Sequence, residues 1–134
     1  MTNGDAQEWL AHAAGDLHYA RLGEKDPDAL ENLIVFHAQQ AIEKALKAVL
    51  VEHAVEFPKT HDVEQLVEII EEQGLVFPAD LDKVLEFTPF ATQGRYPGFD
   101  DAITEADVQE ALGLAEKVLA WARQEVARAS GAGS

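Results

Sequence analysis

Residues 36–48 constrain the fold of this chain more than any other segment. As a helix, the segment is apolar over most of its circumference, yet a row of polar side chains follows one side. The row consists of His37, Gln40, Lys44 and Lys47, which lie three or four residues apart and are therefore neighbours on a helix. A mostly apolar helix is normally buried, and buried polar groups need partners. The segment is therefore predicted to be either the centre of a bundle with an internal polar network or one wall of a site.

Composition is typical of a single globular domain. The 134 residues suit one core of ordinary size, and 47% of them are apolar. There is no cysteine, which excludes disulfides, thiolate metal sites and cysteine nucleophiles. The N-terminus has no signal-peptide pattern, and no apolar run approaches the roughly 18 residues of a membrane span. We therefore expect a soluble cytoplasmic protein that does not associate with membranes.

The charge is strongly acidic, with 25 acidic and 10 basic residues and a formal net charge of −15. A broad nucleic-acid-binding face is not expected, because counterion release requires clustered Lys and Arg. A local basic pocket for a nucleotide or RNA remains compatible with this charge. A basic protein partner is equally compatible with it.

Helical signals cover the whole chain. Asp62 followed by Gln65 resembles a capping box at a helix start, and Thr104 with Asp107 is expected to start the last helix. The residue before Pro89 is disfavoured in a helix, so that a helix must end or kink there. No alternating β-branched run reaches four residues between turns. From apolar spacing and turn residues, the predicted helices span residues 5–22, 28–53, 62–74, 78–88 and, after an ordered loop at 90–103, 104–128.

These elements predict an all-α fold. With short connections, they favour an antiparallel up-and-down helical bundle of four main helices plus a short extra helix. Residues 1–128 would form the single domain, and residues 129–134 a flexible C-terminal tail of small and polar residues.

The polar row has two interpretations. In the structural one, each lysine extends to solvent or pairs with a carboxylate such as Asp16. In the functional one, Lys44 and His37 face an anionic ligand, and the imidazole could also act as a general base. Trp9 lies seven residues before Asp16 and thus on the same helix face, where we favour core packing with one buried ion-pair partner.

Two further segments carry candidate side chains. Asp62 is expected to cap a helix with His61 as a packed or solvated neighbour, although a helix N-terminus also attracts phosphate. In the loop at 94–98, Arg95 suits phosphate or carboxylate recognition and Tyr96 can stack or donate a hydrogen bond. A salt bridge from Arg95 that holds the loop on the bundle is the alternative.

Several kinds of site are excluded. No pair of histidines has the three- or four-residue spacing of a helical metal site, so no metal is expected. No glycine-rich phosphate loop follows a strand, and no cofactor motif is present. The only serines are Ser130 and Ser134 in the tail, which makes a serine nucleophile implausible.

Taken together, these motifs resemble the HEPN domain family, in the order and spacing of its small stand-alone prokaryotic members. The resemblance runs from about residue 5 to 128. It rests on the first helix (Trp9, Ala13, Asp16-Leu17, Ala20), Phe36-His37-Ala38-Gln39-Gln40-Ala41-x-Glu43-Lys44-Ala45-Leu46-Lys47-Ala48, Thr60-His61-Asp62-Val63 and Arg95-Tyr96-Pro97.

The resemblance implies a helical bundle that usually dimerises, with a cleft at or near the dimer interface. Many members are metal-independent ribonucleases that use an Arg followed by four to six residues and a His. Small members are often encoded beside a minimal nucleotidyltransferase as a toxin–antitoxin pair, and a nucleotide-binding role has been proposed for the family. Here no His follows Arg95, and the four-to-six spacing falls on Asp100, Asp101 and Ala102.

The leading hypothesis is therefore a homodimeric HEPN-type nucleotide-binding and interaction module that pairs with a minimal nucleotidyltransferase. Its predicted ligand contacts are His37, Gln40, Lys44, Lys47, His61, Arg95 and Tyr96. One alternative is a metal-independent endoribonuclease toxin, in which Arg95 and Asp100 would be the catalytic residues. The other is a purely structural interaction bundle, in which the polar row fixes helix register.

Overall fold

The computed structural model describes residues 4–78 and 103–131, and within them it contains helices and no strand. The all-α bundle predicted from the sequence is confirmed. The predicted helix at 78–88 and loop at 90–103 fall almost wholly outside the described residues. None of the helices described is long and apolar enough to cross a membrane. In the described residues the helices are α1 (Ala6–Glu24), α2 (Glu31–Glu52), α3 (Val63–Glu72) and α5 (Glu105–Gly131), the last reaching three residues into the predicted tail.

Two helices begin at the capping residues that the sequence indicated. The carboxylate of Asp62 accepts a hydrogen bond from the backbone N–H of Gln65 at 3.3 Å and so caps α3. At α5, the Thr104 hydroxyl accepts from the Asp107 N–H at 3.1 Å, and the Asp107 carboxylate accepts from the Thr104 N–H at 2.9 Å. This reciprocal pair is a capping box, which satisfies two N–H groups that the helix leaves unbonded.

The start of α2 differs from the prediction by three residues. The carboxylate of Asp26 accepts from the Asp28 N–H at 2.9 Å, and its carbonyl accepts from the Ala29 N–H at 3.0 Å. Asp side chains favour such turns over helix because they offer the backbone a competing acceptor. The turn therefore continues past Asp28, and the helix begins at Glu31.

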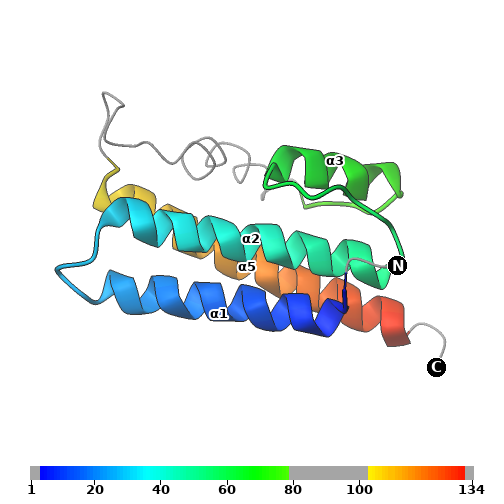
Figure 1. Ribbon diagram of the computed structural model, residues 1–134, viewed down its shortest axis with the longest axis horizontal. Coiled ribbons are helices and arrows are strands. Elements are labelled where there is room, and N and C mark those ends of the chain that lie inside the picture. The colour runs from blue at the N-terminus through cyan, green and yellow to red at the C-terminus, as the bar shows by residue number, and fades with distance from the viewer. Residues whose placement is uncertain (1–3, 79–102, 132–134) are drawn as a thin grey trace.

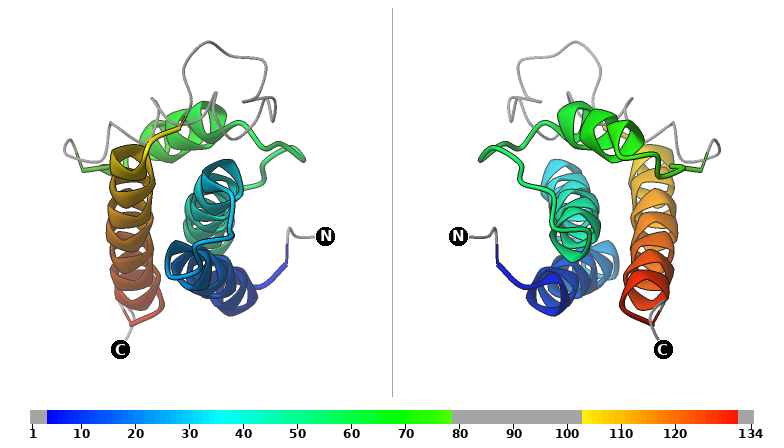
Figure 2. Two further views of the ribbon diagram at one scale, coloured as in Figure 1. Left: turned by 90° about the vertical axis from the view of Figure 1, so that its left-hand side faces the viewer. Right: turned by 90° about the vertical axis from the view of Figure 1, so that its right-hand side faces the viewer.

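Helix α2 lies at the centre of the arrangement. It packs mainly against α1 and α5, and α3 lies across it on another side (Figures 1 and 2). Figure 1 shows α1 running antiparallel to both α2 and α5. From Ala41 to Leu50, every side chain except that of Lys44 is buried. This burial on all sides is what the apolar circumference of the segment predicts.

Polar side chains join α5 to α1 and to the residue that follows α2. Near the C-terminal end of α1, the Arg21 Nε donates to Glu116 of α5 at 2.8 Å. Near the C-terminal end of α5, Glu125 contacts Arg128 and lies 3.0 Å from the Nε2 of His53, which follows α2. The hydrogen bond to Arg128, and to a smaller extent that to His53, holds the pKa of the Glu125 carboxyl below its usual range.

The C-terminus of α2 carries one strained residue. Ala54 has a φ of +58°, a left-handed conformation that L-residues with a Cβ adopt at some cost. Its N–H donates to the Val51 carbonyl at 3.0 Å, and the Val55 N–H donates to the Leu50 carbonyl at 2.9 Å. These two bonds form a Schellman motif, whose left-handed position is usually glycine.

We predict that Ala54→Gly stabilises the protein. Glycine adopts positive φ without a steric penalty, so that the free energy of unfolding should rise by about 1 kcal/mol. Urea denaturation followed by circular dichroism measures this change. Ala48→Gly, inside the same helix, is the matched control and should lower stability. An A54G variant less stable than the wild type would show that this residue is not strained.

Candidate functional site

The first cluster of the site forms around Asp16, where α1 faces α2. The Lys44 Nζ donates to the Asp16 Oδ2 at 2.6 Å, and the His37 Nδ1 lies 3.5 Å from the Asp16 Oδ1. His37 and Lys44 are seven residues apart, and two turns of α2 therefore bring both to the same carboxylate. The lysine thus has the carboxylate partner that the structural interpretation of the polar row named.

The ring of His37 is held by aromatic neighbours but is open to solvent. The Tyr19 ring stacks on it with centroids 6.1 Å apart, and the Phe36 ring meets it edge-on at 5.6 Å. The His37 side chain is 41% exposed, although its Nδ1 atom is buried and has no hydrogen-bond partner within the described part of the chain. Tyr19 and Phe36 therefore hold the ring by packing while part of it faces water.

The second cluster is a buried ion pair between two residues of α2, Glu43 and Lys47. The Lys47 Nζ donates to the Glu43 Oε2 at 2.8 Å, and the two side chains are only 8% and 3% exposed. The His61 Nδ1 lies 3.0 Å from the same oxygen. The Lys47 ammonium also lies 5.3 Å and 5.9 Å from the ring centres of Trp9 and Phe57, within cation–π range.

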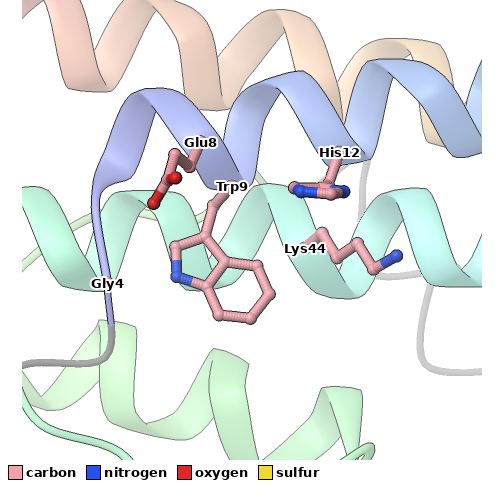
Figure 3. Close-up of a pocket in the computed structure, with 5 residues that line it drawn as sticks. All are labelled: Gly4, Glu8, Trp9, His12 and Lys44. Carbon is pink, nitrogen blue, oxygen red and sulfur yellow. The ribbon is translucent and has the colours of Figure 1, made fainter.

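A pocket of about 300 Å³ opens beside the Asp16 cluster. Figure 3 shows Trp9 and His12 projecting from α1 on either side of it, with the Lys44 side chain below His12. Gly4 passes so close to the indole that a Cβ there would lie 3.3 Å from the Trp9 Nε1. The residues that line the pocket are Gly4, Glu8, Trp9, His12 and Lys44.

This lining offers complementary chemical groups. The indole of Trp9 provides an aromatic face for stacking. Lys44 provides a cation and His12 a hydrogen-bonding imidazole, both suited to an anionic group. Glu8 provides a carboxylate that accepts hydrogen bonds from amino or hydroxyl groups. Within residues 4–78 and 103–131, no three His, Asp or Glu side chains are grouped to hold a metal ion.

The structure divides the predicted ligand residues between the two clusters. His37 and Lys44 meet at Asp16, whereas Lys47 and His61 meet at Glu43. Among the remaining predicted residues, Gln40 is half-buried on the same face of α2. Arg95, Tyr96 and Asp100 lie outside the described residues.

Several residues of the site, among them Glu43, His12 and Glu8, were missed by sequence reasoning. Glu43 lies in the motif at residues 36–48 but was not predicted to take part in the site. Its position four residues before Lys47 is the spacing of an ion pair within a helix. His12 was considered only as a metal ligand. Its three-residue spacing from Trp9 could have placed both on one helix face.

We predict that Lys47→Met lowers the free energy of unfolding by about 3 kcal/mol, because Glu43 loses its main partner and remains buried. The double variant Glu43→Gln/Lys47→Met should recover part of this loss, because no uncompensated charge is left. Lys44→Met, at a more exposed pair, should cost less. Urea denaturation of the three variants measures these differences, and equal losses for Lys44→Met and Lys47→Met would contradict the assignment.

Solved structures provide two comparisons. A crystal structure of an archaeal HEPN homologue is similar with a TM-score of 0.67 and 26% identity, covering 92% of this chain and 98% of that one. A crystal structure of a protein from Thermus thermophilus has a TM-score of 0.76 and 28% identity, covering 90% of this chain and 97% of that one. No match is found among curated proteins.

The family comparison agrees with the fold and with the motifs. The model of the HEPN domain matches residues 6–125, a range that begins at the first residue of α1 and ends within α5. The match covers most of the chain, including the whole of α1 and α2, which carry most of the site. The chain therefore belongs to the HEPN domain family.

Proposed function

We propose that this HEPN chain is a nucleotide-binding and interaction module, and that the pocket between Trp9, His12 and Lys44 is where the nucleotide binds. The observation that carries the proposal is the placement of an aromatic ring, a cation and an imidazole around one opening. Stacking of a base on an aromatic side chain contributes about 1–3 kcal/mol. A phosphate beside Lys44 and His12 would add charge-assisted hydrogen bonds.

The ion pair with Asp16 does not prevent Lys44 from binding a phosphate. An ammonium has three N–H donors, and the Asp16 carboxylate takes one of them at 2.6 Å. Asp16 also fixes the direction of the lysine side chain, which lowers the entropy lost on binding. His37, which meets the same carboxylate, would contact a longer ligand that extends along α2.

The charge of the pocket favours a nucleotide with few phosphates. Glu8 lines the same opening, and the chain as a whole carries a net charge of −15. Among the described residues, Lys44 is the one cation in the pocket lining, so that each further phosphate would meet this negative field without another partner there. Glu8 can instead accept a hydrogen bond from a ribose hydroxyl or a base amino group. A nucleoside monophosphate is the ligand that these groups match best.

The interaction part of the proposal rests on family membership. In the family to which the chain belongs, domains commonly dimerise, and a homodimer paired with a minimal nucleotidyltransferase is the assembly we propose. Arg95 and Tyr96 remain predicted contacts for the nucleotide. Lys47 and His61 we now assign to the support of Glu43 and not to the ligand.

A second candidate is the metal-independent ribonuclease, and one specific contact favours it. Asp16 lies 3.5 Å from the Nδ1 of His37, whose ring is partly exposed. A carboxylate that hydrogen-bonds to one imidazole nitrogen orients the other for proton transfer, and a small shift of the ring would bring Asp16 within that distance. Arg95 would then act with His37 in place of a histidine downstream.

We predict that adenosine monophosphate quenches the fluorescence of Trp9, because the base stacks on the indole. The measurement uses a Trp121→Phe background, since the chain has two tryptophans and Trp121 packs against Phe77 at 5.3 Å, away from the pocket lining. In that background, Lys44→Met should weaken binding by about tenfold, which corresponds to one charge-assisted hydrogen bond.

The matched control is Lys117→Met, which removes the same charge from an exposed position of α5. It should leave nucleotide affinity unchanged. Equal weakening by both lysine variants would mean that only the overall charge matters. The absence of any quenching at millimolar nucleotide would remove the pocket as the binding site.

We also predict that the chain co-purifies with a nucleotidyltransferase encoded beside it when the two are co-expressed, and that the purified chain leaves labelled RNA intact. Size-exclusion chromatography with light scattering then gives the stoichiometry of the complex. Metal-independent cleavage of RNA that is lost in His37→Gln would overturn the module in favour of the ribonuclease. Failure to bind the transferase under these conditions would remove the pairing.

A further inference from the structure

Most of the large apolar side chains that are exposed in the described part of the chain lie in one region. Five large hydrophobic side chains are exposed in total, and four of them lie around the turn between α1 and α2. The fifth, Val76, follows α3 and is 81% exposed. Single exposed apolar residues are common on proteins and need no explanation. A group of four is different. We call these four residues the turn patch: Tyr19 (66% exposed), Leu22 (50%), Leu30 (60%) and Leu33 (51%).

Helix geometry makes the turn patch continuous. Tyr19 and Leu22 are one turn apart on α1, and Leu33 lies one turn after Leu30 at the start of α2. The Tyr19 ring stacks on His37, which is one turn further along α2 from Leu33. The two helices also approach each other closely here, because a Cβ on Gly23 would lie only 3.0 Å from the Ile34 Cγ1. The end of α1 and the start of α2 lie at the same end of the molecule (Figure 1).

The charges beside the turn patch are predominantly acidic. In the segment from Tyr19 to Leu33 there are four acidic residues and two basic residues, which gives a net charge of −2. Asp26, Asp28 and Glu31 are exposed, as is one of the two cations, Lys25. The fourth acidic residue, Glu24, is paired with Arg21 at 3.0 Å. The apolar surface therefore has a negatively charged border.

This border determines which partner suits the surface. A second copy of the chain, docked face to face on this surface, would bring two such borders together. Like charges brought together at an interface cost several kcal/mol. A basic partner would instead gain from the same charges, which also accelerate its association.

We propose that the turn patch is a docking surface for an amphipathic helix of another protein, with apolar anchors three and four residues apart and Lys or Arg on either side of them. Such helices bind through a row of apolar side chains on one face. The exposed side chains of α1 and α2 supply the complementary apolar surface, and the acidic turn selects for basic flanks. This inference does not depend on nucleotide binding, because the turn patch contains none of the residues that line the pocket.

The test uses two designed helical peptides of about five turns. Both carry leucines three and four residues apart, and their flanking residues are lysine in one and glutamate in the other. Fluorescence anisotropy with the full chain should show binding of the lysine peptide only. The double variant Leu30→Ser/Leu33→Ser should weaken that binding by at least about tenfold, the ratio that corresponds to 1.4 kcal/mol. Both side chains are more than half exposed, so that the variant is expected to fold.

Val76→Ser is the matched control, because it removes an exposed apolar side chain outside the turn patch; its affinity should equal that of the wild type. The variant Asp26→Asn/Glu31→Gln should reduce both the association rate and its dependence on salt. Equal binding of the glutamate peptide would overturn the proposal. So would a homodimer that Leu30→Ser/Leu33→Ser converts to monomers in sedimentation velocity, because a second copy would then be the occupant.

Discussion

The ion pair between Glu43 and Lys47 is the interaction on which the arrangement of α2 depends. Both groups lie inside the bundle, and each is tolerable there only because the other is within 2.8 Å. The pair also links parts of the chain that are far apart in sequence, because His61 approaches the carboxylate and the rings of Trp9 and Phe57 flank the ammonium. A rotation of α2 about its axis would leave the pair intact but would separate it from His61, Trp9 and Phe57. The pair therefore specifies the orientation of α2 as well as contributing to its stability.

Much of the fold was predictable from the sequence because the relevant signals are local. Apolar residues three and four apart indicated the helices, and the pairs Asp62–Gln65 and Thr104–Asp107 indicated two helix starts that the structure confirms. The start of α2 was placed too early, because the preference of Asp26 and Asp28 for a turn outweighs the helical pattern that follows. Local signals of similar strength can compete, and spacing alone does not decide between them.

The site was less predictable than the fold. Spacing showed that His37, Gln40, Lys44 and Lys47 share one side of α2, but it could not show that this side meets two different acidic groups. Which polar residues meet depends on how α1 and the segment before α3 pack on α2, and this packing is not encoded in any short stretch of sequence. For the same reason, His12 became visible as a pocket residue only once Trp9 and Lys44 were placed beside it.

The close approach at Gly23 has a consequence for how the chain folds. Because α1 and α2 are neighbours in sequence and pack closely where the chain turns between them, the contacts nearest the turn close short loops. Contacts of this kind form quickly, since little chain entropy is lost in closing them. Docking of α5 requires a much longer loop to close. We therefore expect the hairpin of the first two helices to act as the folding nucleus, onto which the C-terminal helix assembles last.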